Sequence, residues 1–302
     1  MSEFDQALES YRRELLAHCY RMVGSVDDAE DLVQETYLRA WRAQEGFEGR
    51  ASLRSWLYRI ATNVCLTALE RRGRRVLPSG LGPPSTDPLG PVAMGPDVDW
   101  LQPVPDALVA EDDPAEAAVR KDGLRLALVA SLQFLPPRQR AVLLLRDVLA
   151  FRAAEVATTL DMSVAAVKSA LQRARATVAK LTPEQVATPP AEARVVLERY
   201  VKAFENSDAA ALERLLTDDA VLEMTGVCTW FKGKETCLPH LRAVAMESPG
   251  DWSMRPVAAN GQPAVVAYLR GEVYSVVLLT TAGPRLAGIT LFTDPAVLAR
   301  FT

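Results

Sequence analysis

Apolar residues recur every three or four positions through most of the first two thirds of the chain, a spacing that places them on one side of an α-helix. This pattern predicts helices over residues 4–23, 26–43 and 52–72, and a second group over residues 136–148, 152–160 and 164–181. A further helix is expected over residues 193–204, with a shorter one after Asp208. The period then changes to two, which predicts strands over residues 220–225, 263–270, 273–280 and 286–292. We therefore expect a multidomain fold, with two all-α domains followed by an α+β cone in which a curved sheet wraps a pocket.

Residues 135–181 contain two helices joined by a tight turn. Asp161 is expected to adopt the left-handed conformation in the turn, and Ser163 to cap the helix that follows. That helix has a single apolar stripe, made of Val167, Leu171, Ala174, Val178 and Leu181. Its other face carries Lys168, Ser169, Gln172, Arg173 and Arg175. Such side chains neutralise phosphates and hydrogen-bond base edges, so the pair is interpreted as a helix-turn-helix DNA reader. An ordinary helix pair with a solvated basic face is the alternative.

Charge is unevenly distributed along the 302 residues, although the net charge is only −4. Residues 136–181 hold eight basic and three acidic side chains. Residues 1–49 hold five arginines and eleven acids, whereas residues 50–75 hold seven arginines and one acid. Residues 76–114 hold seven acids and no Lys or Arg. Separate segments are therefore expected to bind separate partners.

The composition limits the class of protein. No apolar run approaches the roughly 18 residues that span a bilayer, and the first ten residues lack the basic and apolar parts of a signal peptide. We therefore expect a cytoplasmic protein with no membrane partner. The four cysteines form no C-x-x-C pair, and only two histidines are present. No metal site or cofactor is expected, and the cysteines are predicted to be buried free thiols.

Residues 167–175 (VKSALQRAR) resemble region 4 of sigma-70-type transcription initiation factors, the part that reads the −35 promoter element. This resemblance favours the DNA-reading interpretation over the solvated basic face. It implies −35 contacts from a set of polar residues, namely Arg152, Ser163, Lys168, Ser169, Gln172, Arg173 and Arg175.

The helix over residues 26–43 begins with a capping signal at Ser25 and Asp28. Its apolar face is predicted to be Ala29, Leu32, Val33, Tyr37, Ala40 and Trp41. Residues 28–37 (DAEDLVQETY) resemble region 2.2 of extracytoplasmic-function (ECF) sigma factors, in which exposed acidic and amide residues grip the clamp helices of RNA polymerase. The resemblance implies that Asp31, Gln34 and Glu35 bind polymerase. A solvated acidic face is the alternative.

The helix over residues 52–72 is predicted to bury Leu53, Trp56, Leu57, Ile60 and Val64. Its outward positions and the basic cluster after it hold Arg54, Tyr58, Arg59, Thr62, Asn63, Arg71, Arg72, Arg74 and Arg75. Basic groups beside an aromatic ring and an amide suit melted DNA, whose unpaired bases stack and whose phosphates need countercharge. Residues 47–75 resemble regions 2.3 and 2.4 of ECF sigma factors, which implies that this surface melts and holds the −10 element. The alternative for Tyr58 is a half-buried place at the edge of the core.

Residues 76–114 hold nine prolines and are predicted to run as an extended linker without a packed helix or sheet. A segment of this length spans up to about 130 Å, which exceeds the ~80 Å between promoter elements about two dozen base pairs apart. A passive spacer is one interpretation, and an acidic segment threading a channel built for RNA is the other. Residues 97–106 (DVDWLQPVPD) resemble the signature of SigG-like members of the ECF family.

Residues 200–241 resemble SnoaL-like domains of the nuclear-transport-factor-2 superfamily, some of which are ketosteroid isomerases or polyketide cyclases. The candidate pocket residues are Glu223, Trp230, His240, Trp252, Tyr268 and Asp294. A lone histidine and scattered carboxylates favour a buried apolar pocket without catalysis, and no position is matched to a catalytic acid or base. A small ligand in the cone is a further candidate partner.

Together the resemblances identify the chain as a member of the ECF sigma factor family with a carboxy-terminal SnoaL-like domain. The expected domains are sigma region 2 (1–75), an acidic linker (76–114), sigma region 4 (115–181), a joint (182–190) and the SnoaL-like domain (191–302). We expect a transcription initiation factor, not an enzyme, that binds core RNA polymerase and promoter DNA. The alternatives are an isomerase- or cyclase-type enzyme and a ligand-controlled helix-turn-helix regulator. A regulator that binds only duplex DNA needs no surface for melted DNA, so region 2 argues against the second alternative.

Overall fold

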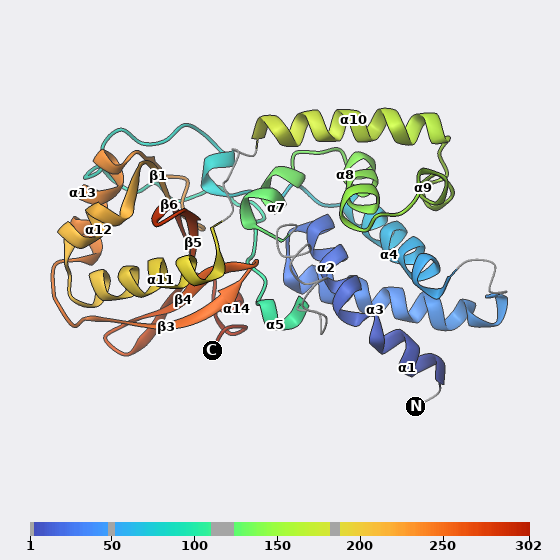
Figure 1. Cartoon of the computed structure of the whole chain (residues 1–302), viewed down its shortest axis with the longest axis horizontal. Coiled ribbons are helices and arrows are strands. Elements are labelled where there is room, and N and C mark those ends of the chain that lie inside the picture. Colours follow the sequence, from blue (N-terminus) through green and yellow to red (C-terminus); the bar gives the residue numbers. More distant parts are fainter. Residues whose placement is uncertain (1–2, 48–51, 110–123, 182–187) are drawn as a thin grey trace. The chain divides into compact units, whose positions relative to one another are not determined.

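The computed structural model describes residues 3–47, 52–109, 124–181 and 188–302 (Figure 1). The chain divides into two compact units. The first contains residues 1–75 and 106–183, and the second contains residues 76–105 and 184–302. Each unit therefore combines two segments that are far apart in the sequence. The domain start predicted at residue 115 and most of the joint predicted at 182–190 lie outside the described residues.

The first unit is helical. Its amino-terminal segment forms α1 (Glu3–Ser10), α2 (Arg12–Val23), α3 (Val26–Ala43) and α4 (Leu53–Leu69), with a 3-10 turn at Gln44–Gly46. Its second segment forms α5 (Asp106–Val109), α7 (Leu126–Leu132), α8 (Pro137–Leu143), a π-helical turn at Leu144–Val148, α9 (Ala153–Leu160) and α10 (Val164–Leu181). The prediction of one continuous helix over residues 4–23 is wrong at Tyr11, which separates α1 from α2. The Tyr11 N–H donates to the Leu8 carbonyl at 3.0 Å.

Helix α3 begins where the sequence predicts, because the Ser25 hydroxyl accepts the Asp28 N–H at 3.1 Å. One predicted core residue of this helix is misplaced. Trp41 is 58% exposed, and Leu38 beside it is 51% exposed. The buried row of α3 ends at Ala40, and the next residue in a helix points about 100° away. Trp41 therefore lies beside Leu38 on the exposed side of α3, away from the buried row.

Helices α9 and α10 form the predicted helix-turn-helix. Asp161 ends α9 in the left-handed conformation, with φ 52° and ψ 57°, and its N–H donates to the Ala157 carbonyl. The Ser163 hydroxyl accepts the Ala166 N–H at 3.1 Å and so caps α10. The predicted apolar stripe is buried at Val167, Leu171 and Ala174, half-buried at Val178 and exposed at Leu181. The first part of the stripe therefore holds α10 against its neighbours.

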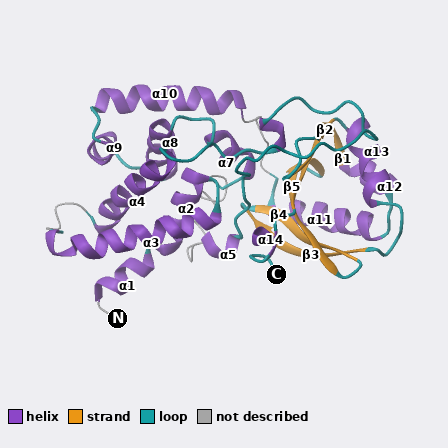
Figure 2. Ribbon diagram, turned by 180° about the vertical axis from the view of Figure 1, so that it is seen from behind, coloured by secondary structure: helices purple, strands orange, loops and turns teal. Residues whose placement is uncertain are grey.

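The second unit is built on a six-stranded sheet with the order β2-β1-β6-β5-β4-β3 (Figure 2). The strands are β1 (Leu216–Met224), β2 (Trp230–Lys232), β3 (Trp252–Ala259), β4 (Gln262–Leu269), β5 (Glu272–Ala282) and β6 (Arg285–Phe292). All neighbouring pairs are antiparallel except β1 and β6, which are parallel. The helices are α11 (Pro190–Glu205), α12 (Ala209–Leu215), α13 (Lys234–Ala245) and α14 (Pro295–Leu298). Side chains of α11, α12 and α13 share one hydrophobic core with the strands, which confirms the predicted α+β cone.

Several elements of this unit were not predicted from the sequence. Strand β3 contains Pro256, which breaks the usual strand signal, and its place at the edge of the sheet tolerates a residue without an N–H. Helix α13 contains Pro239, which likewise weakens the helical signal. The turn between β3 and β4 is formed by Asn260 and Gly261, both with positive φ as in a two-residue hairpin.

Residues 76–105, which we call the strap, belong to the second unit. They contain only a 3-10 turn at Pro78–Gly80, as the proline-rich composition predicts. The predicted extended linker is, however, attached to the second unit along these residues. Isolated β-bridges join Met94 to Val227 and Pro105 to Ala259. Backbone groups of the strap therefore bond to a domain more than 100 residues later in the chain.

The described part of the chain adds three findings, on membrane spans, metal clusters and thiols. None of its helices is long and apolar enough to cross a membrane. It contains no cluster of three or more His, Cys, Asp or Glu side chains arranged to hold a metal ion. All four cysteines are free thiols, and Cys228 is half-buried whereas the other three are buried.

Candidate functional site

Helix α10 exposes a polar surface, which we call the α10 face and which consists of Lys168, Ser169, Gln172, Arg173 and Arg175. Arg173 Nη1 donates to Ser169 Oγ at 2.7 Å. Arg175 forms a bidentate pair with Asp147, with distances of 2.7 and 2.8 Å. Lys168 and Gln172 have no side-chain partner within the described residues. The α10 face therefore presents hydrogen-bond donors to solvent, as the sequence predicts.

Arg152 and Ser163 stand at the starts of α9 and α10. The Arg152 side chain is exposed, and its backbone N–H donates to the Glu155 carboxylate at 2.6 Å. The Ser163 hydroxyl accepts a backbone N–H within α10, as described above, and keeps its own proton for donation. Both residues lie at the turn of the helix-turn-helix, next to the α10 face.

A second exposed surface runs along α3, and we call Asp31, Gln34, Leu38 and Trp41 the α3 row. These four residues are spaced by three or four positions, so they line one side of the helix. Glu35, the third acidic or amide residue predicted for this surface, pairs with Arg39 at 2.7 Å. Leu38 and Trp41 were missed as surface residues. Extending the spacing from Asp31 and Gln34 would have found them.

The prediction that Tyr58 and Thr62 face outward is wrong, because Tyr58 is 1% exposed and Thr62 is fully buried. The Tyr58 hydroxyl donates to Glu14 Oε2 at 3.0 Å, and its ring meets His18 and Phe151 edge to face. Thr62 Oγ1 lies 3.0 Å from His18 Nε2. Their partners are therefore the half-buried Glu14 and buried His18 of α2 and the buried Phe151 before α9.

The arginines predicted for the same surface are largely paired. Arg54 bonds to Glu14 at 3.1 Å, and Arg72 and Arg75 both pair with Asp28. Arg74 stacks on the Phe134 ring at 4.0 Å. Burial alone would raise the pKa of Asp28, but the hydrogen bonds from Arg72 and Arg75 outweigh it and lower this pKa. Arg59, Asn63 and Arg71 remain exposed.

Arg140 of α8 links the two helical segments of the first unit through hydrogen bonds. Its guanidinium is buried and donates to the Met22 carbonyl at the end of α2. It also donates to Gln133 Oε1 at 2.8 Å and to the Gln133 and Leu135 carbonyls. Burial lowers the pKa of Arg140 to about 10, so the group stays charged at neutral pH. No carboxylate among the described residues pairs with it.

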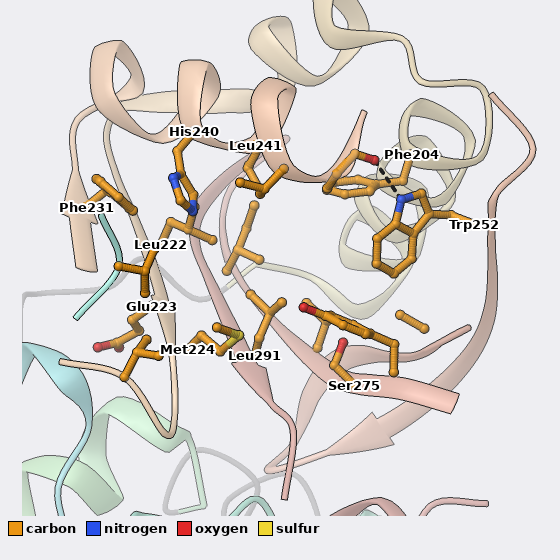
Figure 3. A pocket seen from close by; sticks show the side chains of 18 of the residues that line it. Phe204, Leu222, Glu223, Met224, Phe231, His240, Leu241, Trp252, Ser275 and Leu291 are labelled. Atoms are coloured by element: carbon orange, nitrogen blue, oxygen red, sulfur yellow. Dashed lines mark hydrogen bonds between the residues drawn. The ribbon is translucent and has the colours of Figure 1, made fainter. Parts of the chain in front are cut away.

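The second unit encloses a cavity of about 270 Å³ between the sheet, α11 and α13 (Figure 3). Three predicted pocket residues line it, namely Glu223, His240 and Trp252. The other three do not, and their prediction is corrected. Trp230 donates its indole N–H to the Gly82 carbonyl of the strap, Tyr268 lies 3.5 Å from Arg255, and Asp294 caps α14. Sequence spacing gives the face of a strand but not which end of it reaches the cavity.

Two polar residues of the cavity, Glu223 and His240, both bond to the strap. Glu223 accepts the Ser79 N–H at 3.1 Å, and burial raises the pKa of its carboxyl group. His240 Nδ1 lies 2.9 Å from the Pro88 carbonyl. Val92 of the strap lines the cavity directly. A catalytic interpretation would use Glu223 as the acid and His240 as the imidazole. Both side chains are instead hydrogen-bonded to the backbone of the strap.

Comparisons with known proteins define the class to which these units belong. Residues 7–75 match the family model of Sigma-70 region 2, residues 125–178 match Sigma-70 region 4, and residues 197–293 match the SnoaL-like domain. The helical unit is therefore that of a sigma-70-type initiation factor, and the second unit carries a SnoaL-like domain.

The chain belongs to the family of ECF RNA polymerase sigma factors. It is 48% identical over 309 residues to the ECF RNA polymerase sigma factor SigG of Mycobacterium tuberculosis, an alignment that covers 99% of this chain and 83% of SigG. It is 29% identical over 177 residues to the RNA polymerase sigma-H factor of Pseudomonas aeruginosa, covering 59% of this chain and 84% of that protein. The crystal structure of the M. tuberculosis ECF sigma factor SigJ shares the fold, with a TM-score of 0.65, 21% identity and 99% of each chain covered.

Proposed function

We propose that this sigma factor reads the −35 element with the α10 face and binds core RNA polymerase with the α3 row. The observation that carries the proposal is the exposure of all five predicted polar residues of α10 above a buried apolar stripe. Arginine, lysine and glutamine on an exposed helix match the donor and acceptor pattern of base edges in the major groove. The helix is held by Val167 and Ala174, so its polar side chains are presented from a rigid element.

Replacing Arg173 with alanine should weaken binding to a −35 duplex by about 1 to 3 kcal/mol if its guanidinium reads a base. Fluorescence anisotropy with a duplex selected from a random pool, and with a scrambled duplex, measures this. Lys180→Ala, which removes an exposed charge from the last turn of α10, is the matched control and should affect both duplexes equally. If Arg173→Ala weakened binding to both duplexes equally, Arg173 would contact phosphate and would not read a base.

The α3 row is proposed to bind polymerase because it combines an acid and an amide with two exposed apolar side chains. Leu38 and Trp41 are each more than half exposed, next to Asp31 and Gln34. Large apolar side chains at the surface mark interaction sites when they lie together, and tryptophan is enriched among residues that dominate binding energy. The row thus extends the predicted polymerase contact of Asp31, Gln34 and Glu35 by one helical turn.

The surface of α4 and the arginines after it, which are predicted to hold melted −10 DNA, is proposed to become accessible to that DNA when the segment that carries Phe134 and Phe151 moves away from α4. Phe151 contacts Tyr58, and Phe134 covers Arg74. Melted DNA needs aromatic surface and free cations, and in the described arrangement Arg59, Asn63 and Arg71 already present exposed polar groups. Polymerase that holds regions 2 and 4 apart would free the Tyr58 ring from Phe151 and the Arg74 guanidinium from Phe134, since a partner that favours the open state shifts the population toward it.

The SnoaL-like domain is proposed to regulate transcription instead of catalysing a reaction, because Glu223 and His240 both hold the strap. The strap connects region 2 to region 4 along the chain, so its attachment shortens the free tether between them. A fragment ending at Pro190 should therefore change transcription strength without changing which promoters are used. Run-off transcription at equal concentrations of folded full chain and fragment measures this. Equal output at every concentration would exclude the regulatory role.

A further inference from the structure

The turn that follows α8 has two unusual backbone features. Leu144–Val148 is π-helical, and the Leu149 N–H donates to the carbonyl of Leu144, five residues earlier, at 3.0 Å. Ala150 then adopts the left-handed region with φ 57°, although it carries a Cβ. A left-handed alanine costs conformational energy, and such strain and π-helical turns both gather at functional sites. The turn therefore points to a role beyond joining α8 to α9.

Contacts on both sides hold this turn in place. Leu144 and Leu145 are buried, and the Phe151 N–H donates to the Leu145 carbonyl at 2.9 Å. The Arg146 guanidinium donates to the Phe151 carbonyl. Asp147 lies between these anchored residues and is exposed. The backbone therefore presents the Asp147 carboxylate from a defined position.

The Asp147 carboxylate binds one edge of the Arg175 guanidinium on α10. Oδ2 accepts the Nε–H at 2.8 Å, and Oδ1 accepts an Nη2–H at 2.7 Å. The Arg175 side chain is 60% exposed, and an ion pair so open to solvent contributes little to stability. Two parallel hydrogen bonds do, however, define the plane and direction of a guanidinium. The main consequence of this pair is therefore the orientation of Arg175.

The donors that Arg175 keeps free form a fork. In a planar guanidinium bonded through Nε and Nη2, one hydrogen of Nη1 and the second hydrogen of Nη2 point the same way, away from the carboxylate. Nη1 has no partner within the described residues. A fork of two parallel N–H groups matches the O6 and N7 acceptors of guanine in the major groove.

A hollow of about 300 Å³ lies beside this fork on the α10 face. It is lined by Lys168, Leu171, Gln172 and Arg175. Leu171 is buried and the other three side chains are exposed, so the hollow has an apolar floor and a polar rim. The edge of a base can therefore enter next to the oriented guanidinium.

We propose that Asp147 is a positioning residue that makes Arg175 read a guanine of the −35 element. Asp147 acts only through Arg175, since a carboxylate this close to DNA otherwise repels phosphates and opposes binding. Without Asp147 the Arg175 side chain is free to bond to nearby phosphates, which carry no sequence information. This inference rests on the proposed reading of the −35 element by the α10 face and adds the base and the residue that selects it.

Competition binding with holoenzyme tests the proposal, using core RNA polymerase, the full chain and a promoter library randomised over the −35 region. Sequencing of the bound DNA gives the base preference at each position, and Arg175→Ala identifies the position that Arg175 reads. We expect the unchanged chain to prefer guanine there by about fivefold or more.

Asp147→Asn keeps the shape of the side chain but leaves one acceptor oxygen and no charge. It should lower the guanine preference at this position by at least about threefold, because the bidentate pair is lost. Preferences at the other positions should remain. Affinity for the whole library should rise by up to about tenfold at low salt, because one charge that repels phosphate is removed. A merely structural role for Asp147 would instead lower affinity at every sequence alike.

Asp161→Asn is the matched control. Asp161 is an exposed aspartate in the turn before α10, it forms no ion pair within the described residues, and asparagine also tolerates its left-handed conformation. This variant should raise affinity for the library to a similar extent and leave the guanine preference unchanged. Thermal melts followed by circular dichroism report whether each variant folds.

An unchanged guanine preference in both Asp147→Asn and Asp147→Ala would overturn the proposal, as would an equal loss of affinity at all sequences. If Arg173→Ala altered a base preference and Arg175→Ala altered none, the inference would fail and the proposed −35 reading would stand. If no substitution on the α10 face altered any preference, both would fail.

Discussion

Replacing Asp31 with arginine is expected to weaken the capture of core RNA polymerase by at least about 3 kcal/mol, or more than a hundredfold. The side chain is exposed at the start of the α3 row, so the substitution leaves the helical core intact. It brings a cation to a surface whose acidic and amide groups are proposed to contact polymerase, and placing like charges opposite each other at an interface costs several kcal/mol. Co-purification and competition binding with core enzyme measure the loss.

Glu213→Arg is the matched charge reversal for this experiment. Glu213 is an exposed residue of α12, outside the sigma regions, and its reversal should leave the affinity for core enzyme unchanged. The Asp31 variant should still bind a −35 duplex, because the α10 face is untouched. Normal capture of polymerase by the Asp31→Arg chain would remove this residue from the interface.

Replacing Arg140 with methionine lowers the free energy of unfolding of the first unit by about 2 to 4 kcal/mol. Methionine fills a similar volume but cannot donate to the Met22 carbonyl or to the groups of Gln133 and Leu135. These oxygens belong to buried residues at the contact between α2 and α8, and a buried acceptor left without its donor is unfavourable. The shift of the urea midpoint, followed by tryptophan fluorescence and by circular dichroism, would measure this loss.

Arg138→Met is the control for stability. Arg138 is on the same helix and is exposed, so its replacement should change the free energy of unfolding by less than about 0.5 kcal/mol. An Arg140 variant as stable as the unchanged chain would show that other contacts hold α2 to α8.

Local features of the chain were predicted well where the physical cause is itself local. Asp161 adopts the left-handed turn, Ser163 caps α10, and the polar side of α10 follows from the spacing of its apolar stripe. These features depend on residues within one or two helical turns. A single sequence contains all the information that they require.

Burial of polar residues on α4 could not be predicted in the same way. Tyr58 and Thr62 occupy the side of α4 that periodicity predicts to be exposed. They are buried because Glu14, His18 and Phe151, all 40 or more residues away in the sequence, supply hydrogen bonds and ring contacts. A helical pattern reports which residues are apolar, and it does not report which polar residues find a partner in the tertiary structure.

The attachment of the strap could not be predicted for the same reason, since its partners lie even farther away in the sequence. Its proline content correctly predicts the lack of long helices and strands, but its attachment depends on partners such as Glu223, which is 144 residues from Ser79. Within the cavity, Ser275 was missed because a serine in a strand carries no signal until its surroundings are known. Glu223, His240 and Trp252 were found because their residue types are rare in apolar strands and helices.

The central claim is that this chain directs core RNA polymerase to promoters through the α10 face and the α3 row. In vitro transcription on genomic DNA with core polymerase, followed by mapping of transcript 5′ ends, tests it most directly. With the full chain present, we expect new 5′ ends that share a −35 sequence, and we expect Arg173→Ala to alter that sequence preference and Asp31→Arg to eliminate these 5′ ends. A set of 5′ ends identical to that from core polymerase alone would contradict the account.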